Sequence, residues 1–217
     1  MTSQRRPAVF LFDLDGTLCD SYRAIQASVN HVRGHRGLPP LELGLVRAAV
    51  GNGLVKLLER TVAAGDPEEY ARLFLAHHPG ALQAGTDVLP GVAATLASLQ
   101  ARGDRLGVCS NKPLALTREL LAVMKLDAFF GAVVGPESAP RPKPAPDMLL
   151  VAMRELDAEP ARTLYVGDMT IDVEAGRAAG LAVWVIPSGS HDRAKLADAA
   201  PDRILADFAE VLSFNPS

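Results

Sequence analysis

The strongest constraint on the fold is an apolar run that ends in two acidic residues, in the segment 9–18, which reads VFLFDLDGTL. A run of this kind is typical of a strand buried in a parallel sheet. Side chains alternate along a strand, so Asp13 and Asp15 are predicted to lie on the same side of the strand end. Two carboxylates there are costly to remove from water, and a bound cation relieves that cost. Because Mg²⁺ prefers oxygen ligands, the pattern indicates a magnesium site.

Further apolar runs predict strands at 106–109, 132–134, 163–166 and 182–186. Helix-like segments separate these runs. Regular alternation of strands and helices favours a parallel sheet that is covered by helices on both faces. The predicted fold class is therefore α/β, a doubly wound parallel sheet.

The stretch 20–85 differs because it contains no good strand pattern. Its apolar spacing predicts helices instead, at 21–33, 42–49, 54–63 and 67–77. We therefore expect an all-helical cap, residues 20–85, inserted into an α/β catalytic core made of residues 1–19 and 86–217.

Composition excludes several classes of protein. The chain has 217 residues and is 48% hydrophobic, which is enough for a sizeable core. A net charge of −3 is too weak to indicate nucleic acid or an anionic membrane as partner. Cys19 and Cys109 lack metal-site spacing and predict no disulfide framework, which fits the cytoplasm. No segment approaches the ~18 apolar residues of a membrane span. We expect the protein to be a monomer or a homodimer.

The segment 9–18 resembles the first motif of the haloacid dehalogenase superfamily, and a Rossmann-like core is what the resemblance implies. It also implies that Asp13 attacks phosphorus and that Asp15 shuttles the proton. Asp15 would reach the metal through its backbone carbonyl, and Thr17 would hold the substrate-binding turn.

Two more segments resemble later motifs of that family. Ser110 and Asn111 stand in VCSNK, and the resemblance implies that the Ser110 hydroxyl and the Asn111 backbone N–H bind phosphate oxygens. We expect the next residue, Lys112, to face solvent. Lys143 stands in RPKPAPD on a stiff proline-rich loop. The resemblance makes its ammonium the group that neutralises nucleophile and phosphate, and a cis Lys143–Pro144 bond is a hypothesis for this loop.

The segment 166–172, VGDMTID, resembles the fourth motif. It implies Asp168 as a direct metal ligand and Asp172 as a ligand that acts through water. Met169 departs from the family pattern, which more often has Ser or Thr there. The four motifs follow strands in the same order as in the family, and strand ends of an open α/β sheet converge on one crevice.

The cap resembles that of the phosphoglycolate phosphatase branch, through the segment 50–54, VGNGL. Gly51 and Asn52 open a helix there, and exposed backbone N–H groups at a helix start suit a small anion such as a carboxylate. Lys56 and Arg47 are candidate side-chain contacts. The adjacent pair 77–78, both His, is expected to be exposed.

The sequence thus predicts a Mg²⁺-dependent phosphatase that forms an aspartyl phosphate and acts on a small phosphorylated metabolite, with 2-phosphoglycolate as first candidate by resemblance. A sugar phosphomutase of the β-phosphoglucomutase type remains an alternative. So do a pyrophosphatase or nucleotide phosphatase, and a phosphate-binding protein without turnover.

Overall fold

The computed structural model describes residues 7–62 and 64–216, and a six-stranded sheet lies at its centre. The strand order is β5-β4-β1-β6-β7-β8, and all neighbouring strands are parallel. The strands of this sheet are β1 (Val9–Phe12), β4 (Arg105–Cys109), β5 (Ala132–Val134), β6 (Thr163–Gly167), β7 (Ala182–Val185) and β8 (Arg203–Ile204). The five predicted strands are present, and the two-residue β8 was not predicted.

Helices cover both faces of this sheet, which confirms the predicted fold class. Phe10 and Phe12 of β1 point into one apolar layer, and Val9 and Leu11 point into the other, as the alternation along a strand requires. The first layer is closed by α5 (Val92–Ala101), α6 (Leu114–Val123) and η4 (Phe208–Ser213), and the second by α7 (Asp147–Glu155), α8 (Thr170–Ala178) and α9 (Arg193–Asp198). Short 3-10 turns η1 (Asp127–Phe129), η2 (Pro136–Ser138) and η3 (Pro160–Arg162) complete the core.

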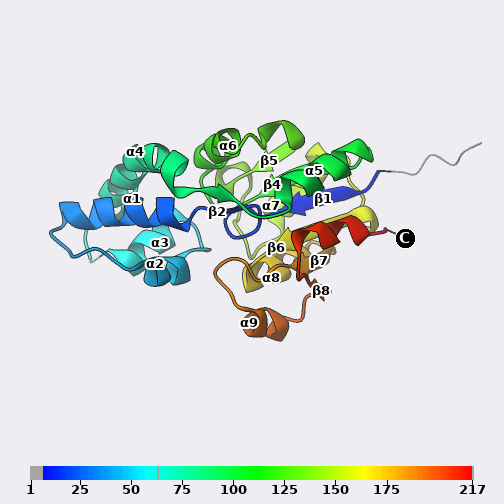
Figure 1. The fold of residues 1–217 in the computed structure, drawn as a ribbon. Helices are drawn as coiled ribbons and strands as arrows, with labels where there is room; N and C mark the ends of the chain where they lie inside the picture. The colour runs from blue at the N-terminus through cyan, green and yellow to red at the C-terminus, as the bar shows by residue number, and fades with distance from the viewer. Residues whose placement is uncertain (1–6, 63, 217) are drawn as a thin grey trace, which may run out of the picture.

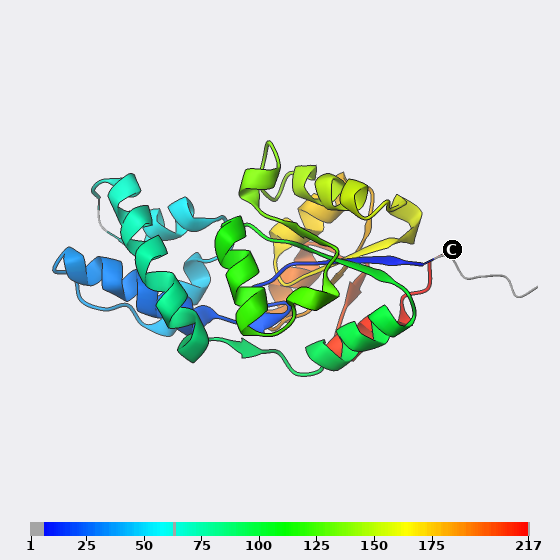
Figure 2. The same cartoon turned by 90° about the horizontal axis from the view of Figure 1, so that it is seen from above.

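Four helices lie to one side of the sheet, at the left of Figures 1 and 2. They have an apolar core of their own, which includes Leu116 from α6. Gly85 of the last helix lies so close to the first that a Cβ atom there would be 2.5 Å from the Ala24 backbone nitrogen. These helices are α1 (Tyr22–His35), α2 (Leu43–Ala49), α3 (Leu54–Thr61) and α4 (Pro67–Gly85).

Helix α4 is longer than predicted. It continues through Pro79 to Gly85, whereas the sequence pattern indicated an end near residue 77. Tyr70, Phe74, His78 and Leu82 are all buried and are spaced four residues apart. One buried stripe therefore runs the length of the helix, and its packing outweighs the proline.

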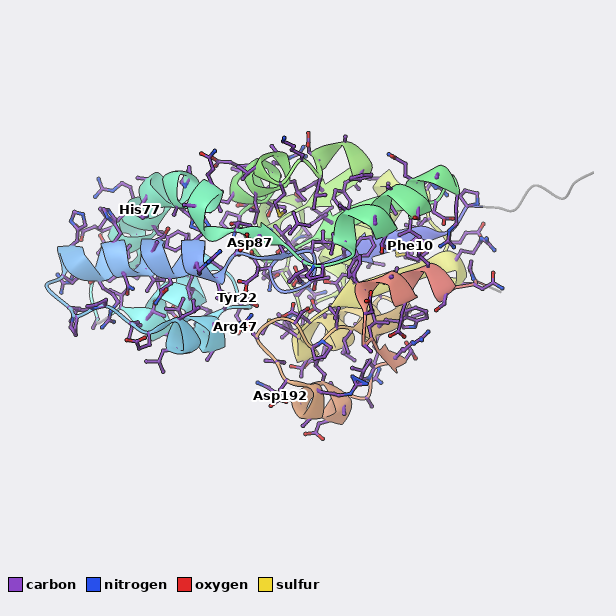
Figure 3. The ribbon with its side chains drawn as sticks, in the orientation of Figure 1. Phe10, Tyr22, Arg47, His77, Asp87 and Asp192 are labelled. Carbon is purple, nitrogen blue, oxygen red and sulfur yellow. The ribbon has the colours of Figure 1, made fainter. Side chains whose placement is uncertain are left out.

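The two chain segments that join these helices to the sheet lie side by side. Strand β2 (Cys19–Asp20) pairs with β3 (Asp87–Val88) in an antiparallel ribbon. Asp87, labelled in Figure 3, also forms an ion pair with Arg23 at 2.5 Å. Such short strands carry no periodicity, so the sequence did not predict them. No helix within the described ranges is both long enough and apolar enough to span a bilayer.

Candidate active site

The first, second and fourth motifs lie at the carboxyl ends of three adjacent strands. Asp13 follows β1, Ser110 follows β4 and Asp168 follows β6, and β1 pairs with both of the others. Parallel strands bring these ends to one edge of the sheet. The convergence that the motif order predicted is therefore present.

Three buried carboxylates meet at this edge. One oxygen each of Asp13, Asp168 and Asp172 lies within 4.8 Å of the others. The pKa of Asp13 is raised to about 6: burial raises it most, the charge of Lys143 lowers it and the charge of Asp172 raises it. Burial, followed by the charges of Asp172 and Asp13, raises the pKa of Asp168 well above its usual value. The negative charge of the three carboxylates is therefore only partly balanced by nearby positive charge.

Lys143 supplies the positive charge of this cluster. Its ammonium lies 3.0 Å from Asp13 Oδ2 and 2.7 Å from Asp172 Oδ1. It also donates to the Tyr165 hydroxyl at 2.9 Å. Burial alone lowers the pKa of Lys143, but the two carboxylates raise it above its usual value, so the side chain stays charged. The Lys143–Pro144 bond is cis, as hypothesised.

The carboxylates differ in how many hydrogen bonds they already accept. Asp172 Oδ1 accepts from Lys143 and Tyr165, and its Oδ2 accepts from the backbone N–H groups of residues 168 and 169. Asp13 Oδ1, in contrast, is buried and has no hydrogen-bond partner in the described part of the chain. An unpartnered buried carboxylate oxygen beside a second carboxylate fits a hard cation such as Mg²⁺.

Asp168 is held by the ends of two loops. Thr17 Oγ1 donates to its Oδ1 at 3.3 Å, and the Ser190 backbone N–H donates to its Oδ2 at 3.0 Å. Glycine at 16 and 189 makes room for this carboxylate, because a Cβ atom would lie 2.5 Å and 1.7 Å from Oδ2 respectively. Thr17 therefore lies where the sequence placed it, in the turn beside the carboxylate cluster.

Asp15 lines the same cavity as Asp13, but its carboxylate has different partners. Strand β1 ends at Phe12, and Gly16 has a φ of 85°, so a tight turn rather than strand alternation places Asp15. Its carboxylate accepts from Ser21 Oγ and lies 3.2 and 3.3 Å from the Lys112 ammonium. Its side chain is not in the carboxylate cluster.

The expectation that Lys112 faces solvent is wrong. Its side chain is only 6% exposed, because the ion pair with Asp15 draws the ammonium inward. No local sequence pattern indicates this contact, because the partner is 97 residues away.

Ser110 and Asn111 are both buried at the cavity. The Asn111 amide donates to the Lys143 carbonyl at 3.0 Å and accepts from the Lys143 N–H at 2.9 Å, so it fixes the loop that presents the lysine. It also donates to the Gly51 carbonyl at 3.0 Å, which ties the site to the helical segment.

The helical segment covers the site and lines a half-open cavity of about 50 Å³. Gly51 lines this cavity and lies against Met169. Asn52 and Lys56 do not line it: Asn52 accepts from Arg60 at 2.8 Å, and the exposed Lys56 pairs with Glu59 at 2.7 Å. Of the residues predicted to bind substrate, Gly51 and Asn111 line the cavity. Thr17, Asn52 and Lys56 do not, and the buried Thr17 hydroxyl contacts Asp168 instead.

Arg47 joins the helical segment to the sheet domain at a second place. Its guanidinium lies over the Tyr22 ring and donates to the Ser188 carbonyl at 3.2 Å. The Tyr22 hydroxyl in turn lies 3.0 Å from Ser190 Oγ. Figure 3 shows Tyr22 and Arg47 together at the edge of the helical segment, facing the loop that leads to α9.

The expectation that both adjacent histidines are exposed is also wrong. His78 has no exposed surface, stacks on Phe74 and is 2.9 Å from Ser28 Oγ through Nδ1. Burial, followed by the charge of Lys112, lowers its pKa to about 3. His78 is therefore neutral. His77, labelled in Figure 3, is only half-buried.

Sequence reasoning missed two further parts of the site. Tyr165 was assigned only to an apolar strand, and its position gives no signal of the bonds that its hydroxyl makes. The loop that contains Ser188 and Ser190 follows β7, whose carboxyl end lies at the same edge of the sheet. Applying the strand-end argument to this fifth strand would have found that loop.

The fold agrees with what comparisons with known proteins show. The family described as haloacid dehalogenase-like hydrolase matches residues 10–186. The chain belongs to the haloacid dehalogenase-like hydrolase family.

Individual relatives match over most of the chain. It is 37% identical to a phosphoglycolate phosphatase of Cereibacter sphaeroides, over 82% of this chain and 84% of the relative. It is 34% identical to phosphoglycolate phosphatase 1 of Pseudomonas aeruginosa, over 96% and 79%. Among solved structures, a predicted phosphoglycolate phosphatase from Haemophilus somnus superposes with a TM-score of 0.89 at 29% identity, over 98% of this chain and 99% of that one.

Proposed function

We propose that this chain is a Mg²⁺-dependent phosphatase that hydrolyses a small phosphate monoester through an aspartyl phosphate on Asp13. Its enzyme class is phosphoric monoester hydrolase. The observation that carries the proposal is the buried Asp13 carboxylate, which has one oxygen against Lys143 and the other without a partner in the described part of the chain, beside Asp168.

In the first step, an Asp13 oxygen attacks phosphorus and the ester P–O bond breaks. Asp15 gives a proton to the departing alkoxide, which leaves as an alcohol. In the second step, water attacks phosphorus, Asp15 takes the proton and the Asp13–phosphorus bond breaks. Asp15 is proposed for the proton because it lines the same cavity as Asp13.

Other residues hold the phosphoryl group in place. We assign the Ser110 hydroxyl and the Asn111 backbone N–H to its oxygens, and the Lys143 ammonium to the negative charge. Asp13, Asp168 and the Asp15 carbonyl would hold Mg²⁺, with Asp172 orienting Lys143 and acting through water. When bound, Mg²⁺ supplies charge neutralisation at the phosphoryl group.

Residues 20–85 are proposed to act as a cap that closes over the substrate and limits bulk water. The names of the relatives support 2-phosphoglycolate as first substrate candidate. We also propose a cytoplasmic location and a monomeric or homodimeric protein.

The test is phosphate release from a panel of esters with Mg²⁺ and with EDTA. The panel contains 2-phosphoglycolate, hexose phosphates, nucleotides and pyrophosphate, ranked by kcat/KM. We expect Mg²⁺-dependent release with 2-phosphoglycolate first. Conversion of a hexose 1-phosphate into a 6-phosphate would identify a mutase. Phosphate binding without release from any ester would identify a binding protein, and either result would contradict the proposal.

A further inference from the structure

The walls of the cavity above Asp13 and Asp15 are mainly apolar. The side chains that form them come from the helical segment and from α6, and include Ile25, Leu54, Leu57, Phe74 and Leu116. A volume of about 50 Å³ holds only a few water molecules. The part of a substrate inside the cavity therefore has to be short, and the apolar side chains of the helical segment offer no hydrogen-bond partner to the hydroxyl groups of a sugar.

Lys112 is the one basic side chain among the described residues that line this cavity. Other positive groups nearby are engaged elsewhere or are neutral. Arg47 donates to a carbonyl of the loop at 188, Lys56 pairs with Glu59, and the imidazole of His78 carries no charge. A negative group that enters the cavity thus has a single basic side chain on the cavity wall to pair with.

Lys112 lies next to the place where the leaving group of the substrate has to be. Its ammonium is 3.2 and 3.3 Å from the two oxygens of Asp15, the residue proposed to protonate the departing oxygen. A substituent one carbon from that oxygen has to lie next to Asp15, and so next to Lys112. An ammonium has three N–H donors, and the two Asp15 oxygens take two of them, so one donor is left for a ligand.

We propose that Lys112 determines specificity by binding a carboxylate on the leaving group, so that the enzyme prefers phosphate esters of short 2-hydroxy acids. This inference rests on the proposed phosphatase function and deepens it. It assigns substrate recognition to the core residue Lys112 instead of the cap side chains of Arg47 and Lys56.

The simplest rival is that Lys112 only holds Asp15 in place. The two roles differ in their dependence on the substrate. A positioning role affects every ester alike, whereas recognition of a carboxylate affects only esters that carry one.

The experiment compares 2-phosphoglycolate with its neutral carboxamide, which has nearly the same size and shape. For wild type we expect kcat/KM to favour the acid by more than tenfold. In Lys112→Met this preference should fall about tenfold to a hundredfold, the range expected for a lost charge-assisted hydrogen bond. Lys112→Arg keeps the charge and should keep most of the preference. Lys195→Met, an exposed lysine of α9, is the matched control and should leave both values unchanged.

Several outcomes would overturn the inference. One is a wild type that hydrolyses both compounds equally, which needs no variant and so does not depend on folding of Lys112→Met. Another is an equal loss for both compounds in Lys112→Met, which would assign Lys112 to positioning and leave the phosphatase proposal intact. A selective loss in Lys56→Met instead would place recognition in the cap. No hydrolysis of either compound or of any panel ester would reject the proposed function itself.

Discussion

At the scale of single residues, Asp168 and Asp172 show how two buried carboxylates of one motif differ. Both are completely buried. Asp172 accepts four hydrogen bonds, including one from the Lys143 ammonium. Asp168 accepts from Thr17 and Ser190 and faces two other carboxylates. Asp172 is stabilised by its protein partners, whereas Asp168 has no ion-pair partner of its own in the described part of the chain.

Replacing each by its amide should therefore have different effects on the stability of the metal-free protein. Asp172→Asn leaves Lys143 with one carboxylate fewer, and breaking a buried pair costs about 3–5 kcal/mol. Asp168→Asn removes a buried charge whose pKa is raised by burial, so we expect no loss of stability in EDTA. Denaturant unfolding of both variants in EDTA measures this.

The two variants can also be compared by titrating their activity with Mg²⁺. Asp168→Asn should raise the Mg²⁺ concentration for half-maximal activity, because a ligand is lost. If the two variants lose the same stability in EDTA, the assignment of their different roles is wrong.

The residues of the motifs could be predicted from sequence, but their partners could not. Asp13, Ser110 and Asp168 lie together because strand ends of one sheet converge, and Asn111 fixes the loop that presents Lys143 to them. The inward position of Lys112 depends on a turn that directs Asp15 toward it, and no local pattern encodes that turn's direction.

At the scale of elements, helices α1 and α4 pack around the buried His78. Its Nδ1 is 2.9 Å from Ser28 Oγ, Phe74 stacks on the ring, and its Nε2 has no partner among the described residues. The pKa of His78 is lowered from 6.5 to about 3, chiefly by burial. The unfolded chain then binds a proton below pH 6.5 that the folded chain does not bind until about pH 3.

The contribution of His78 to stability is accordingly complete above pH 6.5 and declines as the pH falls through the window from 6.5 to 3. At 1.36 kcal/mol per pH unit, a change from pH 6.5 to 5 removes about 2 kcal/mol. His78→Gln cannot titrate, so its free energy of unfolding should fall less over this range. Denaturant unfolding at a series of pH values measures the slope.

The exposed His35 provides the control for this slope. His35→Gln should keep the wild-type pH dependence. If His78→Gln and wild type lose stability in parallel, His78 is not held neutral by burial and the account of α4 fails.

Elements with a clear apolar pattern in the sequence were predicted well, whereas elements without such a pattern were not predicted. The apolar runs at 9–12 and 132–134 give β1 and β5 with unchanged bounds. The end of α4 was missed because Pro79 is a local signal, while the buried side chain of Leu82 beyond it depends on tertiary packing. The ribbon of β2 and β3 depends on two segments that meet only after the fold has formed.

At the scale of the whole molecule, the helical segment and the sheet meet at a site that gathers buried negative charge. Among the described residues, three carboxylates face one ammonium there, that of Lys143. A bound cation should therefore stabilise the entire fold, because it binds the folded state and the unfolded chain lacks this site.

We expect Mg²⁺ at about a hundred times its dissociation constant to add about 2.7 kcal/mol. For a chain of this size that corresponds to a rise in Tm of about 5 to 10 °C. Thermal unfolding in EDTA, in Mg²⁺ and in KCl of equal ionic strength separates binding from screening. Equal Tm values in Mg²⁺ and KCl would contradict a cation site at the carboxylate cluster.

The central claim is that Asp13 is the nucleophile, and Asp13→Asn tests it most directly. The measurement is Mg²⁺-dependent phosphate release from 2-phosphoglycolate by the variant and by wild type, with circular dichroism showing that both are folded. The account predicts that turnover falls by at least about a thousandfold, because an amide oxygen cannot form the acyl phosphate. A folded Asp13→Asn protein that keeps wild-type turnover would contradict the account.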